Sequence, residues 1–385
     1  MKTKFLLLVQ FILAFSLINA QVDTTTKKKH LNLVLGSDSN IVFSGTRIIP
    51  KSDTNEIRKI ELSGYISTYY AYYSDLTDNG GLVQFPTMAA RNKQFGLNLA
   101  QIGMEYSDKN VRGNIILHYG DIPESNWPKP FTLIQEAHAG VKLINKLWLD
   151  AGFFKSHIGL ESTQPRENIT SSMAILDFYE PYYFSGAKLT YELNSKITLQ
   201  LNAFNGFNTY VENNNNKALG FSAIYDINDN ISLTYNLLSC DETPDNIKTK
   251  HQRFYHNLYG TMQLKKWSIG FEANYGTQQN SLLADSTQTA SVYSGLLVAK
   301  YQMIKKLAVY GRGEIFSDKN MILTNNLNLG NGIYGGTFGV EFKPAKTVAL
   351  SAEYRVLQCD EFIFKEKGFT TNQRNDFILC LDLWF

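Results

Sequence analysis

Residues 377–385 read Phe377-Ile-Leu-Cys-Leu-Asp-Leu-Trp-Phe385 and give the first indication of the fold. Side chains alternate between the two faces of a strand, so the five Phe and Leu residues at odd positions share one face and Asp382 lies on the other. A soluble protein rarely ends on such an apolar strand, because its free edge would promote aggregation. A closed barrel in an outer membrane has no free edge, and a terminal strand of this kind is expected there.

The beginning of the chain is typical of a secretory signal peptide. Residues 1–4 are basic, an apolar stretch follows from Phe5 to Ile18, and Ala20 is a small residue suited to cleavage. We expect residues 1–20 to be removed after export. The alternative is a membrane anchor, but the apolar stretch is short against the ~20 residues that a spanning helix needs. Residues 21–58 are expected to form a periplasmic tail or a small plug segment, and the sequence does not choose between them.

The composition agrees with an all-β membrane barrel. The mean hydropathy is -0.22, whereas a helical membrane protein would be clearly positive; a barrel has apolar residues only at every second position. The formal net charge is +2, which disfavours nucleic acid as a partner because binding it requires a concentrated basic surface.

From residue 59 to residue 385 the sequence divides into about sixteen segments of roughly ten residues, the length of strand that crosses a bilayer at a tilt. We predict strands at Ile60–Tyr73, Lys93–Tyr106, Val111–Gly120, Ile134–Ile144, Leu147–Lys155, Phe184–Leu193, Ile197–Asn205, Ala218–Asp226, Ile231–Ser239, Phe254–Leu264, Trp267–Tyr275, Val292–Tyr301, Leu307–Ser317, Tyr334–Lys343, Val348–Leu357 and Asp376–Phe385. Two of them fit poorly. Lys93–Tyr106 changes face near Gln101, which indicates a β-bulge, and Val292–Tyr301 is apolar on both faces.

The predicted connections alternate in length. Short turns lie at Ser107–Asn110, Asn145–Lys146, Asn194–Lys196, Ile227–Asn230, Lys265–Lys266, Gln302–Lys306 and Pro344–Thr347. They are rich in residues that favour tight hairpins. Long polar connections lie between them. This rhythm is typical of a transmembrane antiparallel β-barrel with short periplasmic turns and long extracellular loops, and it predicts a location in the bacterial outer membrane, in contact with its lipid.

If the apolar faces contact lipid, the other faces line a lumen. An Arg or Lys facing lipid at mid-membrane costs ~2–4 kcal/mol, so charged strand residues are expected to point inward. These residues are Glu61, Arg112, Glu136, Lys142, Asp150, Lys188, Glu192, Glu272, Arg312, Glu314, Glu341, Glu353, Arg355 and Asp382. Many of them would pair across neighbouring strands, and the mixture of signs does not name a solute.

The longest predicted connection, Ser156–Tyr183, is expected to be functional, because loops beyond ~15 residues are usually functional or disordered and this one is rich in aromatic residues. We expect it to fold into the lumen and narrow it; a loop packed on the rim is the alternative. The candidate pore-lining or constriction residues are Asp150, Glu161, Arg166, Glu167, Glu136, Lys142, Arg112, Lys188, Arg312, Glu314, Glu353 and Arg355.

Several short motifs occur in an order that resembles the OmpL-like β-barrel porins of Bacteroidetes-type bacteria. They are Gly159–Pro165, Glu180-Pro181, Ser185–Tyr191, Asn205–Asn208 and Asn213–Lys217. The resemblance extends from about Lys59 to Phe385 and implies an outer-membrane porin. It implies no catalytic residue, cofactor or metal site.

The function expected from these observations is an aqueous channel for small hydrophilic solutes or ions, because about sixteen strands enclose a channel whereas eight strands fill with side chains. An outer-membrane anchor or adhesion protein whose loops bind a partner is the alternative. A hydrolase built on His138 and Glu136, which share a face of one predicted strand, is a further alternative without a nucleophile signature. The sequence leaves a homotrimer open.

Three smaller signals carry less weight. Cys240 and Cys359 each follow a predicted strand end, so a disulfide between them remains open. Gly330–Gly335 matches G-x-G-x-x-G but precedes a strand, where a dinucleotide site requires a helix. Asp226–Asn230 lacks the Gly and Glu of a calcium loop and is expected to be a hairpin turn.

Overall fold

The computed structural model describes residues 32–35, 59–75 and 81–385. The chain divides into two compact units, Met1–Asn32 and Leu33–Phe385, and the barrel lies in the second. The expected signal peptide, residues 1–20, lies outside the described residues. Of the expected tail or plug, residues 21–58, the structure describes only strand β1 (Asn32–Leu35). Both assignments therefore stay predictions.

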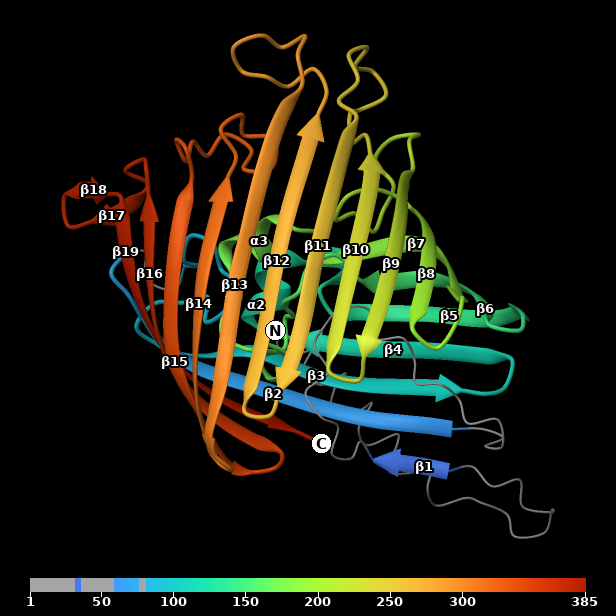
Figure 1. Ribbon diagram of the computed structural model, residues 1–385. Coiled ribbons are helices and arrows are strands. Elements are labelled where there is room, and N and C mark those ends of the chain that lie inside the picture. The colour runs from blue at the N-terminus through green and yellow to red at the C-terminus, as the bar shows by residue number, and fades with distance from the viewer. Residues whose placement is uncertain (1–31, 36–58, 76–80) are drawn as a thin grey trace. The chain divides into compact units, whose positions relative to one another are not determined.

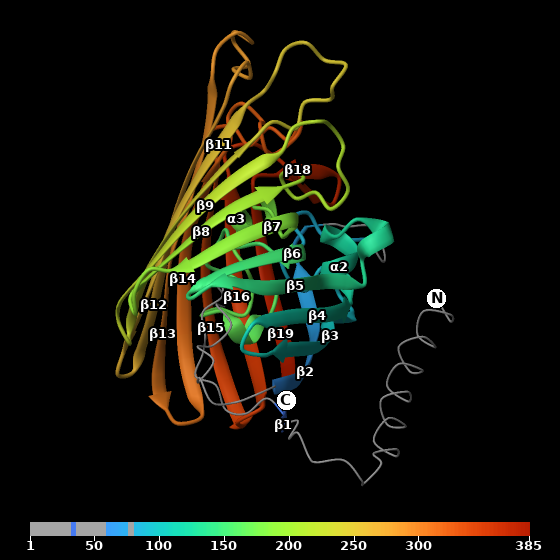
Figure 2. The ribbon, with the colours of Figure 1, turned by 90° about the vertical axis from the view of Figure 1, so that its right-hand side faces the viewer.

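Sixteen antiparallel strands, β2 to β16 and β19, follow one another around a closed barrel (Figures 1 and 2). They are β2 (Lys59–Tyr73), β3 (Phe95–Ser107), β4 (Val111–Tyr119), β5 (Ile134–Ile144), β6 (Leu147–Lys155), β7 (Tyr183–Glu192), β8 (Ile197–Phe204), β9 (Ala218–Asn228), β10 (Ile231–Cys240), β11 (Arg253–Leu264), β12 (Trp267–Gln278), β13 (Ala290–Ile304), β14 (Leu307–Ser317), β15 (Ile333–Ala345), β16 (Val348–Cys359) and β19 (Gln373–Trp384). The predicted sixteen-strand barrel is confirmed. A small hairpin, β17 (Phe364–Glu366) and β18 (Phe369–Thr371), precedes β19.

The barrel closes where the last long strand meets the first. Strand β19 pairs with β2 from Asp376 opposite Tyr73 to Trp384 opposite Tyr65. The ring of Phe385 lies against Gly64, where an added Cβ atom would come within 2.2 Å of it, so a side chain at this position would displace the ring. Residues 377–385 therefore form the seam of the barrel.

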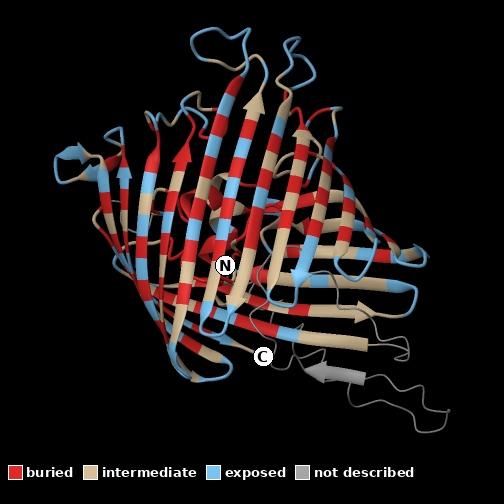
Figure 3. Ribbon diagram, viewed as in Figure 1, coloured by how far each residue is buried: buried red, intermediate tan, exposed pale blue. Residues whose placement is uncertain are grey.

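Burial alternates along the strands, as Figure 3 shows. Phe377, Leu379 and Leu381 are exposed on the outside of β19. Asp382 is buried on the inside, where its Oδ1 atom accepts a hydrogen bond of 2.8 Å from the hydroxyl of Tyr65. The outer surface is thus apolar and the inner surface polar, as period-2 patterning predicts.

Short turns gather at one rim and long loops at the other. Several short turns are two residues long, and such turns favour backbones with positive φ. Lys146 and Lys265 have φ values of 66° and 48°. All the short turns predicted from the sequence are present, including the Asp226–Asn230 segment, which closes the hairpin of β9 and β10.

The two poorly patterned strands each have a structural cause. In β3 the pairing with β2 shifts between Ser67 and Thr68, which leaves Asn98 as the extra residue of a bulge. The predicted change of face in this strand is therefore confirmed, and it occurs at Asn98, three residues before Gln101. The bulge turns Asn98 inward, where its Oδ1 atom accepts a bond of 2.7 Å from the N–H of Ala89 in the β2–β3 loop. Strand β13 is apolar inside because Leu296 and Val298 contact a buried loop.

The helical segments of the described residues all lie in long loops. They are α2 (Asp121–Asn126), η1 (Lys129–Phe131), η2 (Pro165–Glu167) and α3 (Ile175–Tyr179). None of the described helices is long and apolar enough to cross a membrane. Cys240 and Cys359 are separate free thiols at the ends of β10 and β16, which are not neighbours in the barrel, so the disulfide left open by the sequence does not form.

Leu297 tests the outer face, because it lies in the middle of β13 and is 62% exposed. Leu297→Arg is expected to lower the free energy of unfolding in lipid bilayers by ~2–4 kcal/mol, since an arginine at this depth leaves water for hydrocarbon. Denaturant titration of the reconstituted barrel measures this change, with Leu297→Ala as the control for lost apolar area. Equal stability of the Arg and Ala variants would contradict the assignment of this face to lipid.

Candidate functional site

The connection between β6 and β7, residues 156–182, runs inside the barrel, and we call it the long loop. Its apolar side chains Ile158, Leu160 and Ile175 belong to one buried cluster with inward-facing side chains of β11, β13 and β14. None of its residues is classed as exposed. The predicted position of this segment inside the lumen is therefore confirmed. Its role in narrowing a conducting path stays a prediction.

Arg312 on β14 holds the middle of the long loop. Its guanidinium is fully buried and donates to the carboxylate of Glu161 at 3.0 Å. It also donates to the hydroxyl of Thr170 at 2.8 Å and to the carbonyl oxygen of Ser172 at 2.6 Å. An arginine has five fixed donors, so one side chain can tie together several points of a loop.

Two carboxylates of the wall accept backbone N–H groups of the same segment. Glu353 on β16 accepts bonds of 3.2 Å from the N–H groups of Ser171 and Ser172. Glu314 on β14 accepts a bond of 2.5 Å from the N–H of Ile175 and one of 2.6 Å from the guanidinium of Arg355. Charge-assisted bonds of this kind are stronger than those between neutral groups. The structure thus brings together five predicted residues: Arg312, Glu314 and Glu353 of the wall bind the loop, Glu161 belongs to the loop, and Arg355 binds Glu314.

The long loop also reaches the opposite wall. The amide of Gln164 donates to Gln101 of β3 at 2.5 Å, and Gln135 of β5 donates to the hydroxyl of Thr163 at 3.2 Å. Near the entry of the loop, Lys155 lies 3.2 Å from Glu167. The segment therefore crosses the lumen and is fixed on both sides of it.

Strands β4 to β7 carry further predicted charges on their inner faces. Arg112 donates to Asp150 at 2.7 Å, and Lys188 lies 3.9 Å from the centre of the Phe154 ring. Glu136 lies 3.5 Å from His138. Lys142 lies over the ring of Trp148, and Arg166 of the long loop lies over the ring of Trp384 near the short-turn rim. Both signs of charge are present on this wall.

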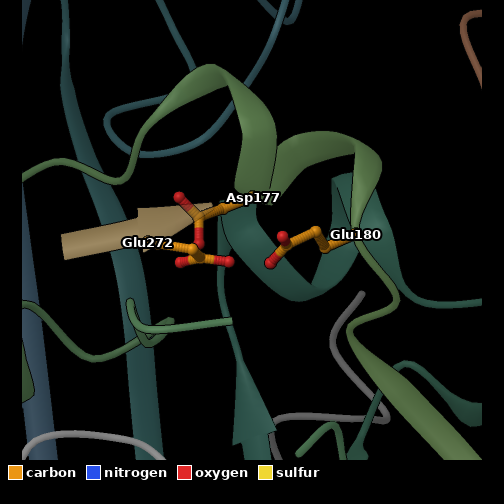
Figure 4. A group of neighbouring side chains, drawn as sticks. All are labelled: Asp177, Glu180 and Glu272. Carbon is orange, nitrogen blue, oxygen red and sulfur yellow. The ribbon is translucent and has the colours of Figure 1, made fainter. Parts of the chain in front are cut away.

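Three carboxyl groups meet where α3 contacts β12. Asp177 and Glu180 come from the long loop and Glu272 from β12, and their oxygens lie within 4.8 Å of one another (Figure 4). Asn274 donates to Glu180 at 2.6 Å, and the N–H of Leu160 donates to Glu272 at 2.7 Å. Carboxyl groups at this spacing can share protons or a cation. We call them the carboxyl cluster.

Burial raises the pKa of both loop carboxyls well above their ordinary values, because the charged forms lose water. The neighbouring carboxylate of Glu161 raises the pKa of Asp177 further, and that of Glu272 raises the pKa of Glu180 further. Protonated carboxyls can then donate hydrogen bonds to ionised ones, which holds α3 against the wall.

A row of uncharged polar side chains crosses the strands beneath the loop. Gln200, Ser222, Asn236, Asn257 and Asn274 occupy paired positions on five consecutive strands, β8 to β12, and we call them the amide ladder. Asn236 donates to Asn257 at 2.8 Å, and Asn257 donates to Asn274 at 2.7 Å. The buried oxygens of Gln200, Ser222 and Asn236 have no hydrogen-bond partner among the residues that the structure describes.

The sequence alone does not reveal the amide ladder or the carboxyl cluster. Asp177 is not among the predicted site residues, Glu180 is named only in the Glu180-Pro181 motif, and Glu272 is one predicted inward charge among many. Two signals could have found them. Asp177 lies in the short apolar helix α3 and Glu180 directly follows its last residue, and the inward positions of β8 to β12 are rich in Asn, Gln and Ser.

Known proteins with this architecture are outer-membrane porins. The family described as "Putative beta-barrel porin-2, OmpL-like" matches residues 59–385. The outer membrane channel DcaP of Acinetobacter baumannii is similar with a TM-score of 0.60 and 12% identity, over 86% of this chain and 99% of that chain. An anion-selective porin from Comamonas acidovorans is similar with a TM-score of 0.57 and 10% identity, over 85% and 100%. The trimer form of OmpT of Vibrio cholerae reaches 0.57 and 11%, over 86% and 100%. No curated protein matches significantly.

The carboxyl cluster predicts that α3 loosens as the pH rises. A carboxyl whose pKa is raised by folding stabilises the folded form below its ordinary pKa, near 4.5 for Glu180, and this stabilisation is lost as the pH rises through the raised value. Hydrogen exchange of residues 174–181 in the folded barrel, corrected for intrinsic rates, should therefore increase between pH 5 and pH 9. In Glu180→Gln the amide cannot ionise, so this increase should be markedly smaller.

Glu361→Gln, in an exposed loop, is the matched control and should retain the response. An unchanged pH response in Glu180→Gln would contradict the proton-sharing account. Loosening caused by a chelator at constant pH would indicate that a cation, rather than protons, neutralises the cluster.

Proposed function

The chain belongs to the OmpL-like β-barrel porin family, and from this premise we propose that its barrel forms an outer-membrane channel for small hydrophilic solutes or ions, narrowed by the long loop. Family membership carries the assignment of a porin. The sixteen-strand barrel supports it, because a barrel of this size has room for an aqueous path. In this setting the short turns lie on the periplasmic side and the long loops outside.

The narrowing is supported by one observation above all, the attachment of the long loop to both sides of the lumen. Arg312 and Glu353 hold it at β14 and β16, and Gln101 and Gln135 hold it at β3 and β5. A segment tied at both walls reduces the open cross-section at its own depth. The space that remains would lie beside partly accessible charges such as Arg112, Lys188 and Glu167.

Solutes would enter from the side of the long loops. A cavity of about 460 Å³ opens there among three of these loops, and its lining is mostly polar, including Thr243, Arg253, Gln278, Asn280 and Asn320. This cavity also favours the second candidate function, a protein whose outer loops bind a partner. Conduction by the purified barrel separates the two.

Two further assignments follow the same reasoning. The family favours a channel over an enzyme. The Nδ1 atom of His138 has no hydrogen-bond partner in the described part of the chain, so the nucleophile that a hydrolase would require is not placed beside it. A homotrimer is the assembly that the similarity to the trimer form of OmpT suggests, and cross-linking of the folded protein in membranes would test it.

Planar-bilayer recording tests the channel. The purified protein should give stepwise conductance, and deletion of Thr163–Ala174 should increase the step size, because it removes the part of the loop held by Arg312 and Glu353. Deletion of residues 284–287, in an exposed outer loop and outside the lining of the cavity among the long loops, is the control and should change the step size little. A barrel that inserts but stays silent would argue against a porin; equal step sizes would argue only against the constriction.

A charge reversal at Lys188 tests whether charges beside the proposed path set the ion preference of the channel. Its ammonium faces inward on β7 next to the ring of Phe154, so Lys188→Glu replaces a positive charge by a negative one inside the lumen. The permeability ratio of K⁺ to Cl⁻, obtained from reversal potentials in a salt gradient, should rise severalfold, because fixed charges set ion preference. Lys248→Glu on an outer loop should change this ratio far less. An identical ratio for both variants would remove Lys188 from the path.

A further inference from the structure

The seven short turns carry an unusual concentration of lysine. They contain Lys109, Lys146, Lys196, Lys265, Lys266, Lys305, Lys306 and Lys346, and their only acidic residues are Asp108 and Asp229. All eight lysines are exposed. We call this ring the lysine collar. Residues on the opposite rim carry mixed charges, as in the Asp245–Lys250 loop, so the asymmetry belongs to one end of the barrel.

The backbone indicates that turn geometry alone does not explain these lysines. Lys146 and Lys265 have positive φ values of 66° and 48°. Glycine and asparagine occupy this left-handed region more readily, and two-residue hairpins favour Asn-Gly. The chain instead has Asn145-Lys146 and Lys265-Lys266 at these turns. An ammonium group is therefore present where the conformation favours a different residue.

The collar borders the apolar outer surface directly. Ile144, Leu264 and Ile304 immediately precede three of the turns and are 63%, 46% and 64% exposed. Each strand residue advances ~3.3 Å, so the ammonium groups lie within about one headgroup layer of the hydrocarbon boundary. Trp267, next to Lys266, is 45% exposed on the outside, where an aromatic ring marks a membrane interface.

Five of the eight ammonium groups can still donate hydrogen bonds to a ligand. Lys196 and Lys306 each donate one bond to a carbonyl oxygen of a neighbouring turn, at 3.1 and 3.0 Å, and an ammonium has three donors. Lys146, Lys265 and Lys305 make no ion pair among the residues that the structure describes. Their charges are thus not neutralised within the barrel.

We propose that the lysine collar binds the phosphate groups of anionic phospholipids in the periplasmic leaflet. This inference rests on the outer-membrane setting of the proposed function but not on conduction. The depth of the lysines favours a lipid headgroup over the anionic cell-wall polymer, which lies farther from the hydrocarbon boundary. Each lysine near an anionic surface strengthens association about fivefold, so several acting together select anionic over zwitterionic lipid.

Trp267 offers a local probe of this selection. Of the four tryptophans, Trp127 and Trp148 are buried and Trp384 lies inside with Arg166, so Trp267 is the one on the lipid side. The full-length protein is reconstituted in phosphatidylcholine vesicles containing a fixed fraction of either brominated phosphatidylglycerol or brominated phosphatidylcholine. Bromine quenches nearby tryptophan, so the ratio of the two quenching constants reports the relative association of the anionic lipid beside the collar.

In the wild type this ratio should exceed one severalfold and fall toward one in 1 M salt, which screens charges beyond about 3 Å. The variant with Lys146, Lys265, Lys266, Lys305 and Lys306 changed to Gln should lose most of the preference. The matched control changes five exposed lysines of the other rim, Lys248, Lys250, Lys319, Lys365 and Lys367, to Gln and should keep it.

A ratio near one in the wild type, or the same ratio in both five-lysine variants, would overturn the proposal. So would lysine-dependent sedimentation with purified cell-wall sacculi in the absence of any lipid preference. The salt series on the wild type answers the question even where a variant fails to fold. Bilayer conductance is recorded separately, so that a silent barrel with a lysine-dependent lipid preference counts against the channel alone.

Discussion

Backbone hydrogen bonding without water is the constraint on which this structure depends. In hydrocarbon an unpaired N–H or C=O group costs several kcal/mol, so strands can cross a membrane only in a ring whose first and last members pair. The pairing of β19 with β2 meets this requirement. Once the ring is closed, the period of two along each strand assigns one side chain to lipid and the next to the lumen. Long loops, short turns and the polar interior follow from that assignment.

The interior of the barrel is packed like the core of a soluble protein, because its side chains surround the long loop. The loop contributes apolar side chains such as Ile158 and Ile175, and the wall contributes charged groups that bind the backbone of the loop. Buried charges are tolerated where they are paired, and Arg312 illustrates this with several partners. The carboxyl cluster differs from this pattern. Its members repel one another when ionised, so they need protons or a cation to lie this close together.

The barrel was predictable because strand pattern and turn chemistry are local properties of a sequence. All sixteen strands match the prediction, and no strand end differs from it by more than three residues. The bulge in β3 was visible only as a change of face, since its exact position depends on how Asn98 contacts the β2–β3 loop. The anchors Arg312 and Glu353 could be named as inward charges. Their partners in residues 170–173 could not, because contacts between residues 140 to 182 positions apart are set by the closed ring and leave no local signal.

The way in which the wall holds the long loop has a consequence for how such proteins diversify. Glu353 and Glu314 accept main-chain N–H groups of Ser171, Ser172 and Ile175, and every residue except proline offers such a group. This main-chain part of the attachment therefore does not depend on which side chains the loop carries at these positions, whereas the hydroxyl of Ser172 and the apolar side chain of Ile175 add contacts that do. Evolution or protein engineering could therefore change the loop side chains that a solute contacts while the strands of the barrel stay the same.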